Sequence, residues 1–209
     1  MHLTRPSSVT TENPNNQATL QSAGNRYYLT VDQYHRMAEC GILNEEDRVE
    51  LLGGQLVPKM PQNPPHAGSV LLAQTKLLSH LPPDWVLRVQ SSITLADSEP
   101  EPDLVVARGR MRKYVRRHPG ARDIGLVVEI ADASLDMDRQ VKGVLYAQGR
   151  IPAYWIINLC DAAIEVYTLP RAGKAPSYRQ MQEYGKGGKV PLVLDDTLVV
   201  ELPVRDLLP

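Results

Sequence analysis

The sequence predicts an α/β domain, and three features of its second half carry that prediction. Residues 124–131 are apolar at both odd and even positions, which is typical of a central strand covered on both faces. Residues 136–149 then show apolar side chains at helical spacing, and residues 153–159 are apolar again. A strand, a helix and a strand in succession imply a parallel pair of strands joined by a right-handed crossover.

The first 25 residues differ in composition from the rest of the chain. They are rich in Ser, Thr, Asn, Gln and Pro, so we expect residues 1–25 to be a disordered arm and residues 26–209 to form one domain. No apolar run follows Arg5, which argues against a signal peptide.

The elements of the first half are each signalled locally. Thr30 and Gln33 form a capping-box pattern, which predicts a short helix that ends near Gly41. Two apolar runs flank Gly53-Gly54 and predict a hairpin, although the first run could also end a helix. A helix is predicted over residues 66–81. The strands expected after it cover residues 85–89, 93–95 and 104–107.

In the second half, a helix is predicted over residues 136–149. Val141, Leu145 and Gln148 form one stripe of it, with Val144 and Ala147 beside them. Further strands are predicted at residues 164–169 and between residues 178 and 202, around a Gly-Lys-Gly-Gly turn.

Composition excludes several classes of protein. Apolar residues make up 43% and charged residues 22% of the chain, as in ordinary soluble domains. No apolar run approaches the ~18 residues that span a bilayer. Cys40 and Cys160 lie 120 residues apart, which fits no metal-binding spacing. Two such cysteines also argue against a disulfide framework, so a reducing cytoplasm is expected. The net charge of −1 neither demands nor excludes a nucleic-acid partner.

An acidic segment precedes the strand at residues 104–107. Its acids occupy alternate positions and would project to one side of an extended chain; they are Asp97, Glu99, Glu101 and Asp103. Pro102 favours an extended conformation before it, so Asp103 arrives at the mouth of a buried strand. The alternative is a solvated acidic loop.

Glu129 lies inside the apolar run Leu126–Ile130, where an ionised carboxylate needs a compensating metal ion or lysine. The alternative is a strand-end glutamate that reaches water or an arginine. Lys142 follows on the next helix and is long enough to reach back over the strand. Alone it would be read as a solvated lysine paired with Asp138.

A basic segment separates the two acidic strands. Seven cations occur within fifteen residues, namely Arg108, Arg110, Arg112, Lys113, Arg116, Arg117 and Arg122. Phosphodiester hydrolysis requires acids that bind a divalent metal ion and nearby cations that bind the polyanion. A charge run is also often just a solvated face.

These motifs together resemble a known family. They are Glu101-Pro-Asp-Leu-Val-Val106, Val127-Val-Glu-Ile130, Asp138-Arg139 with Lys142 and Tyr146, and Ile151-Pro-Ala-Tyr-Trp-Ile-Ile157, preceded by Glu50–Gly54 and the Pro61…His66 segment. In this order and spacing they are similar to the Uma-type branch of restriction endonucleases within the PD-(D/E)xK superfamily. The resemblance covers about residues 27–200.

The resemblance implies a restriction-endonuclease-like fold, a mixed β-sheet core flanked by helices. Asp103 would match the Asp of the PD motif and Glu129 the acid of the (D/E)xK motif. Both would bind Mg²⁺ or Mn²⁺, with Glu50 as a further ligand or water-positioning group. Lys142 would be a catalytic lysine displaced onto the helix, since Ala131 stands where the unmigrated lysine would be. Gln90 could also line the site.

The expected function is therefore magnesium-dependent endonuclease activity on DNA, by a cytoplasmic homodimer. The residues expected to bind DNA are Arg108, Arg110, Arg112, Lys113, Arg116 and Arg117. Two alternatives stay open. If Lys142 does not reach the site, the chain could be an inactive nucleic-acid binder. If the basic segment faces away from Asp103, it could be a protein-interaction module.

Overall fold

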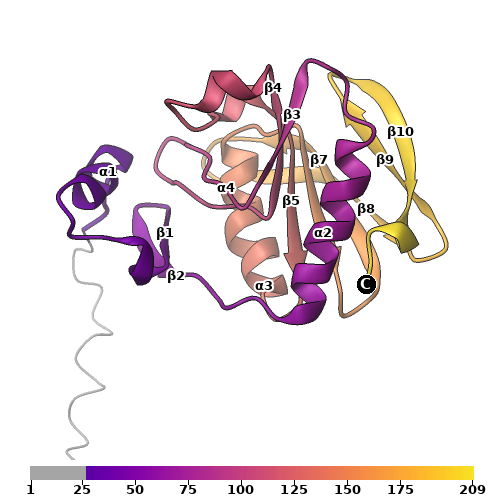
Figure 1. Ribbon diagram of the computed structural model, residues 1–209, viewed down its shortest axis with the longest axis horizontal. Helices are drawn as coiled ribbons and strands as arrows, with labels where there is room; N and C mark the ends of the chain where they lie inside the picture. Colours follow the sequence, from indigo (N-terminus) through magenta and orange to yellow (C-terminus); the bar gives the residue numbers. More distant parts are fainter. Residues whose placement is uncertain (1–26) are drawn as a thin grey trace, which may run out of the picture.

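A six-stranded mixed sheet forms the centre of the computed structural model, which describes residues 27–209 (Figure 1). The predicted arm over residues 1–25 lies outside the described residues. Strands β5 and β6 run parallel, as the predicted crossover requires, and every other neighbouring pair is antiparallel. In order across the sheet the strands are β3 (Trp85–Val89), β4 (Leu104–Arg108), β5 (Ile124–Ala131), β6 (Ala153–Asn158), β7 (Ala163–Arg171) and β8 (Ser177–Gly185).

Strand β5 is buried along its whole length because both faces of the sheet are covered. Its Leu126, Val128 and Ile130 pack towards helix α2 (Pro64–Leu78) and the hairpin of β9 (Lys189–Leu194) and β10 (Thr197–Pro203). Val127 and Ala131 pack on the other face, towards the helical segment that joins β5 to β6. Figure 1 shows α2 and α4 on opposite sides of β5.

The helical segment between β5 and β6 contains a π-helical turn that the sequence did not predict. It comprises α3 (Leu135–Met137), the π-turn η4 (Asp138–Lys142) and α4 (Gly143–Gln148). The Gly143 N–H donates to the carbonyl of Asp138, five residues earlier. This extra residue changes which side chains share a helix face. Val141, on the predicted stripe, and Val144, beside it, are exposed. Tyr146 is buried instead.

The N-terminal part of the described chain matches its local signals. Helix α1 (Val31–Glu39) begins at the predicted capping box of Thr30 and Gln33. Strands β1 (Val49–Leu52) and β2 (Gln55–Pro58) form the predicted hairpin. Helix α1 buries none of its residues and is held by a few polar contacts, among them a hydrogen bond from the Tyr34 hydroxyl to the Val49 carbonyl at 3.2 Å.

Two predicted elements differ in the structure. Helix α2 begins earlier than expected because the Asn63 side chain caps it, and it ends at Leu78. The strand predicted at residues 93–95 is absent. That segment instead folds into a loop, in which the Ile93 N–H donates to the carbonyl of Pro100. Pro100 and Pro102 have no N–H to donate, so a regular ladder cannot continue there.

Short 3₁₀ turns complete the described structure, at Glu45–Asp47 (η1), Met111–Tyr114 (η2), Ala121–Asp123 (η3) and Val204–Asp206 (η5). Within residues 27–209, no helix is both long and apolar enough to cross a membrane.

Candidate active site

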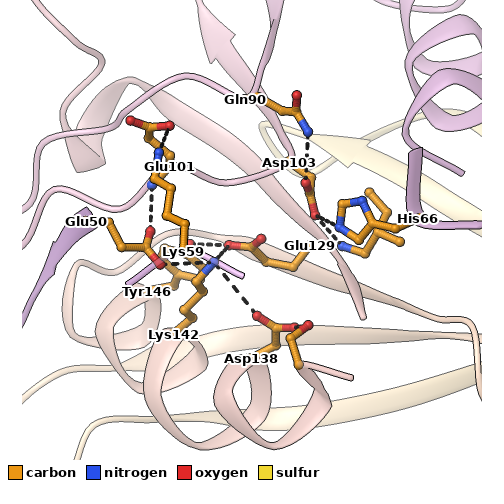
Figure 2. A network of polar contacts seen from close by, with 12 residues as sticks. Glu50, Lys59, His66, Gln90, Glu101, Asp103, Glu129, Asp138, Lys142 and Tyr146 are labelled. Carbon is orange, nitrogen blue, oxygen red and sulfur yellow. Dashed lines mark hydrogen bonds and ion pairs between the residues drawn. The ribbon is translucent and has the colours of Figure 1, made fainter. Parts of the chain in front are cut away.

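Asp103 and Glu129 lie side by side at the ends of β4 and β5. The register pairs Leu104 with Val128, so the residues just beyond that pair, Asp103 and Glu129, are neighbours across the ladder. Strand β5 runs on past the start of β4, and the Asp103 carboxylate accepts the otherwise unpaired Ile130 N–H at 2.8 Å. Its other oxygen lies 3.5 Å from the Gln90 amide, so Gln90 lines the site as expected (Figure 2).

Glu129 is a buried carboxylate, only 3% exposed. Its Oε1 accepts hydrogen bonds from the Lys142 ammonium at 3.0 Å and from the Tyr146 hydroxyl at 2.7 Å. Burial raises the pKa of Glu129 to about 8, and the attraction of Lys142 opposes that rise without cancelling it. Lys142 therefore compensates the burial of this carboxylate only in part.

Lys142 stands at the centre of the acids. Besides Glu129, its ammonium lies 3.7 Å from Glu50 and 3.9 Å from Asp138 (Figure 2). Burial alone would lower the pKa of Lys142, but the surrounding carboxylates outweigh burial and raise it, so the lysine stays charged. The π-turn carries Asp138 and Lys142 and leads into Tyr146, so one helix face supplies three side chains to the cluster.

Glu50 brings the N-terminal hairpin into the site. It lies on β1 and is buried, and its Oε2 accepts the Glu101 N–H at 3.0 Å. The Glu101 side chain forms an ion pair with Lys59, which follows β2. The structure thus gathers Glu50, Asp103, Glu129 and Lys142 in one place, from two strands, the start of a third and a helix.

His66 is a member of the cluster that was not among the site residues expected from the sequence. Its Nε2 lies 3.1 Å from Asp103 Oδ2. Burial is the largest single influence and lowers the pKa of His66, but the hydrogen bond to Asp103 and the charges of Asp103 and Asp138 together outweigh it, so the pKa is raised. The Asn63 cap starts α2 early enough to place His66 in its first turn, beside the strand ends. The one available signal was the family-like Pro61…His66 segment.

A divalent metal ion fits the donor set of this cluster. Carboxylate oxygens are the ligands that Mg²⁺ and Mn²⁺ prefer, and Asp103 and Glu129 offer them from adjacent strands. The raised pKa of Glu129 marks a site where more positive charge would be stabilising. As they stand, Lys142 and His66 hold these carboxylates, and no three His, Cys, Asp or Glu side chains of residues 27–209 form a ready-made metal site.

The cluster lies beside an open groove of about 1470 Å³. Asp103, Gln90 and Glu101 line its floor, and α1 lines one side. The other side is the segment Tyr114–His118.

The fold places only some residues of the basic segment at the groove. Arg116 and Arg117 line the groove, and Arg117 also forms an ion pair with Asp123 at 2.7 Å. Lys113 binds the same carboxylate, and Arg110 and Arg112 are exposed outside the groove lining. Arg108 turns away at the far end of β4, where it stacks on Trp85 and pairs with Asp195. Only part of the predicted DNA-binding set therefore faces Asp103.

Comparison with known proteins gives a family and a fold. The model of the Uma2 family, described as "Putative restriction endonuclease", matches residues 31–205. One similar solved structure is described as a putative nuclease belonging to DUF820 from Anabaena variabilis. It superposes with a TM-score of 0.66 at 15% identity, over 86% of this chain and 97% of that one. No curated protein matches the sequence. Because the family model spans most of the chain, this protein belongs to the Uma2 family.

Proposed function

We propose that this chain is a divalent-metal-dependent endonuclease that hydrolyses phosphodiester bonds of DNA, with Mg²⁺ as the cofactor and Mn²⁺ able to replace it. One observation supports this above all. Asp103, Glu129 and Lys142 converge in a nearly buried cluster beside a groove that Arg116 and Arg117 also line. Nuclease chemistry needs that combination of carboxylates, a fixed ammonium and nearby cations.

Each residue has a role that its contacts support. Asp103 and Glu129 would hold the metal ion, and Glu50 would be a further ligand or would position water. A bound divalent cation supplies polarisation of a phosphate oxygen and a lower pKa for a bound water. Lys142 holds Glu129 in place by its contact at 3.0 Å and would stabilise the negative charge that develops on the phosphate. In the reaction, water oxygen bonds to phosphorus in line as the bond to the leaving oxygen breaks.

The basic segment would bind the DNA backbone unequally. Arg116 and Arg117 line the groove and would contact phosphates near the reacting bond. The exposed Arg110 and Arg112 would act at longer range, whereas Lys113 and Arg108 are already engaged by Asp123 and Asp195. Binding by such contacts weakens steeply as salt concentration rises.

Cleavage of single-stranded and double-stranded DNA by the purified protein tests this function. We expect cleavage that requires Mg²⁺ or Mn²⁺, stops on chelation and is lost in Asp103→Asn and Glu129→Gln. A matched control is Asp136→Asn, since Asp136 is an exposed acid near the π-turn. If cleavage persisted at the wild-type rate in both site variants, the assigned residues would be wrong.

A second function is supported by one observation. Lys142 and His66 already hold the two main carboxylates, an arrangement that also suits a domain that binds nucleic acid without cutting it. DNA binding without cleavage under any metal condition would favour that alternative.

For cleavage of both strands of a duplex we propose a homodimer, because two active sites related by a two-fold axis can each cut one strand. Light scattering after size-exclusion chromatography measures this directly. A monomer at the concentrations that support double-strand cleavage would remove the dimer from the proposal.

A further inference from the structure

Two segments that line the groove beside the cluster both contact Glu99. Helix α1 supplies His35 to one wall, and the segment after η2 supplies His118 to the other. Both imidazoles reach the same oxygen of buried Glu99, with His35 Nε2 at 2.8 Å and His118 Nε2 at 3.7 Å. The two Nε2 atoms are therefore no farther apart than the sum of these two distances. At this point the walls approach each other across a single carboxylate.

The reacting groups are recessed beneath those walls. Asp103 is 7% exposed, and Glu129 and Glu50 are also buried. A B-form duplex presents a broad convex surface to a protein, and its phosphates lie on the outside of that surface. Such a surface reaches a nearly buried Asp103 poorly, whereas an extended single strand can lie along the groove.

The walls also carry apolar and aromatic side chains that can contact bases. Met60 is 71% exposed and Val115 is 76% exposed, and both line the groove. Tyr34 lines it too, held by its hydrogen bond to the Val49 carbonyl. Apolar and aromatic side chains contact the faces of unpaired bases, which a duplex keeps stacked inside.

The charges of the groove permit a polyanion to enter. The floor acid Glu99 is held by His35 and by the Thr94 hydroxyl at 2.9 Å, and Glu101 is paired with Lys59. The cations Arg48, Arg116 and Arg117 line the rim and walls. The groove volume of about 1470 Å³ exceeds the roughly 300–1,000 Å³ of small-molecule sites, which suits several linked nucleotides.

We propose that the substrate is single-stranded DNA, or the unpaired part of a partly duplex DNA, bound along this groove between α1 and the segment Tyr114–His118. This inference rests on the proposed nuclease function and names the substrate for the same site. An unpaired strand requires one active site, so the preference does not depend on a dimer.

Three DNA ligands of one sequence test the proposal: the single strand, its blunt duplex, and a duplex with a single-stranded tail. Binding of the wild-type protein is measured by fluorescence anisotropy without added metal, and cleavage is measured with Mn²⁺. We expect the single strand to bind about tenfold or more tightly than the blunt duplex. Cleavage should fall within the single strand and the tail.

Variants separate base contacts from phosphate contacts. The neutral double variant Met60→Ser, Val115→Ser should weaken single-strand binding about tenfold and leave the weak duplex binding unchanged. Arg116→Gln should weaken both. The matched control is Leu198→Ser, which removes an exposed apolar side chain of β10 outside the groove lining and should change neither.

The outcomes distinguish this inference from the proposed function. Metal-dependent cleavage with equal or tighter binding of the blunt duplex would overturn the single-strand preference and leave the nuclease intact. A double variant that binds the single strand as tightly as wild type would also overturn it. If no DNA were cleaved, the nuclease proposal would fail, while the binding comparison would still decide which DNA the groove accepts.

Discussion

At the scale of single residues, the cluster depends on how Glu129 is compensated. Its carboxylate is buried and receives two hydrogen bonds, yet burial still raises its pKa to about 8. A carboxylate in this state gains from any added positive charge. The same residue therefore explains why Lys142 is held so closely and why a metal ion would bind.

The ammonium of Lys142 is expected to act in the chemical step more than in binding. Replacing Lys142 by Met removes the charge at similar length, so cleavage should slow by about 10²–10³-fold while DNA affinity changes little. Single-turnover cleavage and anisotropy on the same samples measure both quantities. Lys174→Met, at an exposed lysine, is the control. Wild-type cleavage by the Lys142 variant would remove the lysine from the mechanism.

His66 is expected to orient Asp103. Its Nε2 contacts Asp103 Oδ2, the oxygen that also accepts the Ile130 N–H. Partners that orient a metal ligand typically contribute about 10–100-fold to affinity, so His66→Ala should weaken Mn²⁺ binding by that factor. His80→Ala is a matched control, because His80 is exposed and hydrogen-bonded only near the end of α2. Unchanged Mn²⁺ affinity in the His66 variant would argue against this role.

The sequence indicated some residues of the cluster and missed others for a physical reason. Glu129 and Asp103 could be singled out because a charged residue within or beside an apolar strand is conspicuous. Glu50 was reached through the family resemblance, and Lys142 through its place on the helix after Glu129 together with that resemblance. Lys59 carries no such signal, and His66 only that of the family-like Pro61…His66 segment. Each of these two residues acquires its acidic partner only when segments far apart in the chain come together.

At the scale of elements, the π-turn decides which helix face meets the sheet. Helical periodicity assumes a regular repeat, so it grouped Val141 and Val144 in or beside one stripe and left out Tyr146, which is buried. One inserted residue changes that assignment. Irregular turns of this kind are frequent at functional sites, where they redirect a side chain. Here the redirected side chains include Lys142 and Tyr146.

The packing of β5 against its neighbours leaves no room at Gly125. A Cβ there would lie 2.6 Å from the Trp85 ring and 2.9 Å from Leu194. Gly125→Ala should therefore destabilise the fold by about 1–3 kcal/mol. Thermal unfolding measures this, with Gly187→Ala as the control because a Cβ at Gly187 meets nothing within 4 Å. Equal melting temperatures for both variants would show that the core accommodates the methyl group.

Asp123 anchors the basic segment, and its contribution to stability depends on pH. Although partial burial acts to raise the pKa of Asp123, Arg117, Lys113 and the Gly120 N–H together hold it well below the ordinary value of 3.8. A carboxyl whose pKa is lower in the folded state stabilises the fold above its unfolded pKa, and that stabilisation is lost as pH falls below it.

Asp123→Asn should therefore lower the melting temperature at pH 7, with a difference from wild type that shrinks as the pH falls below about 4. Melting curves at several pH values measure the difference. Asp136→Asn supplies the control and should show no such trend. A difference that grew on acidification would contradict the assigned direction of the pKa shift.

At the scale of the whole molecule, the sequence predicted the order of the elements better than the assembly of the groove. The apolar run of β5 and the crossover to β6 identified the centre of the sheet, since a strand buried on both faces has a recognisable composition. The groove is different. Its walls come from α1 and from the segment Tyr114–His118, which are far apart in sequence and both contact Glu99. No local pattern encodes such a meeting.

Calorimetric titration of Mn²⁺ into the wild-type protein and Glu129→Gln, each with and without DNA, tests the central claim most directly. We predict saturable binding to the wild type and its loss in the variant, whose circular dichroism should match that of the wild type. A wild-type protein that binds no metal ion with or without DNA would contradict the account, and the cluster would then be a buried ion-pair network of a binding domain.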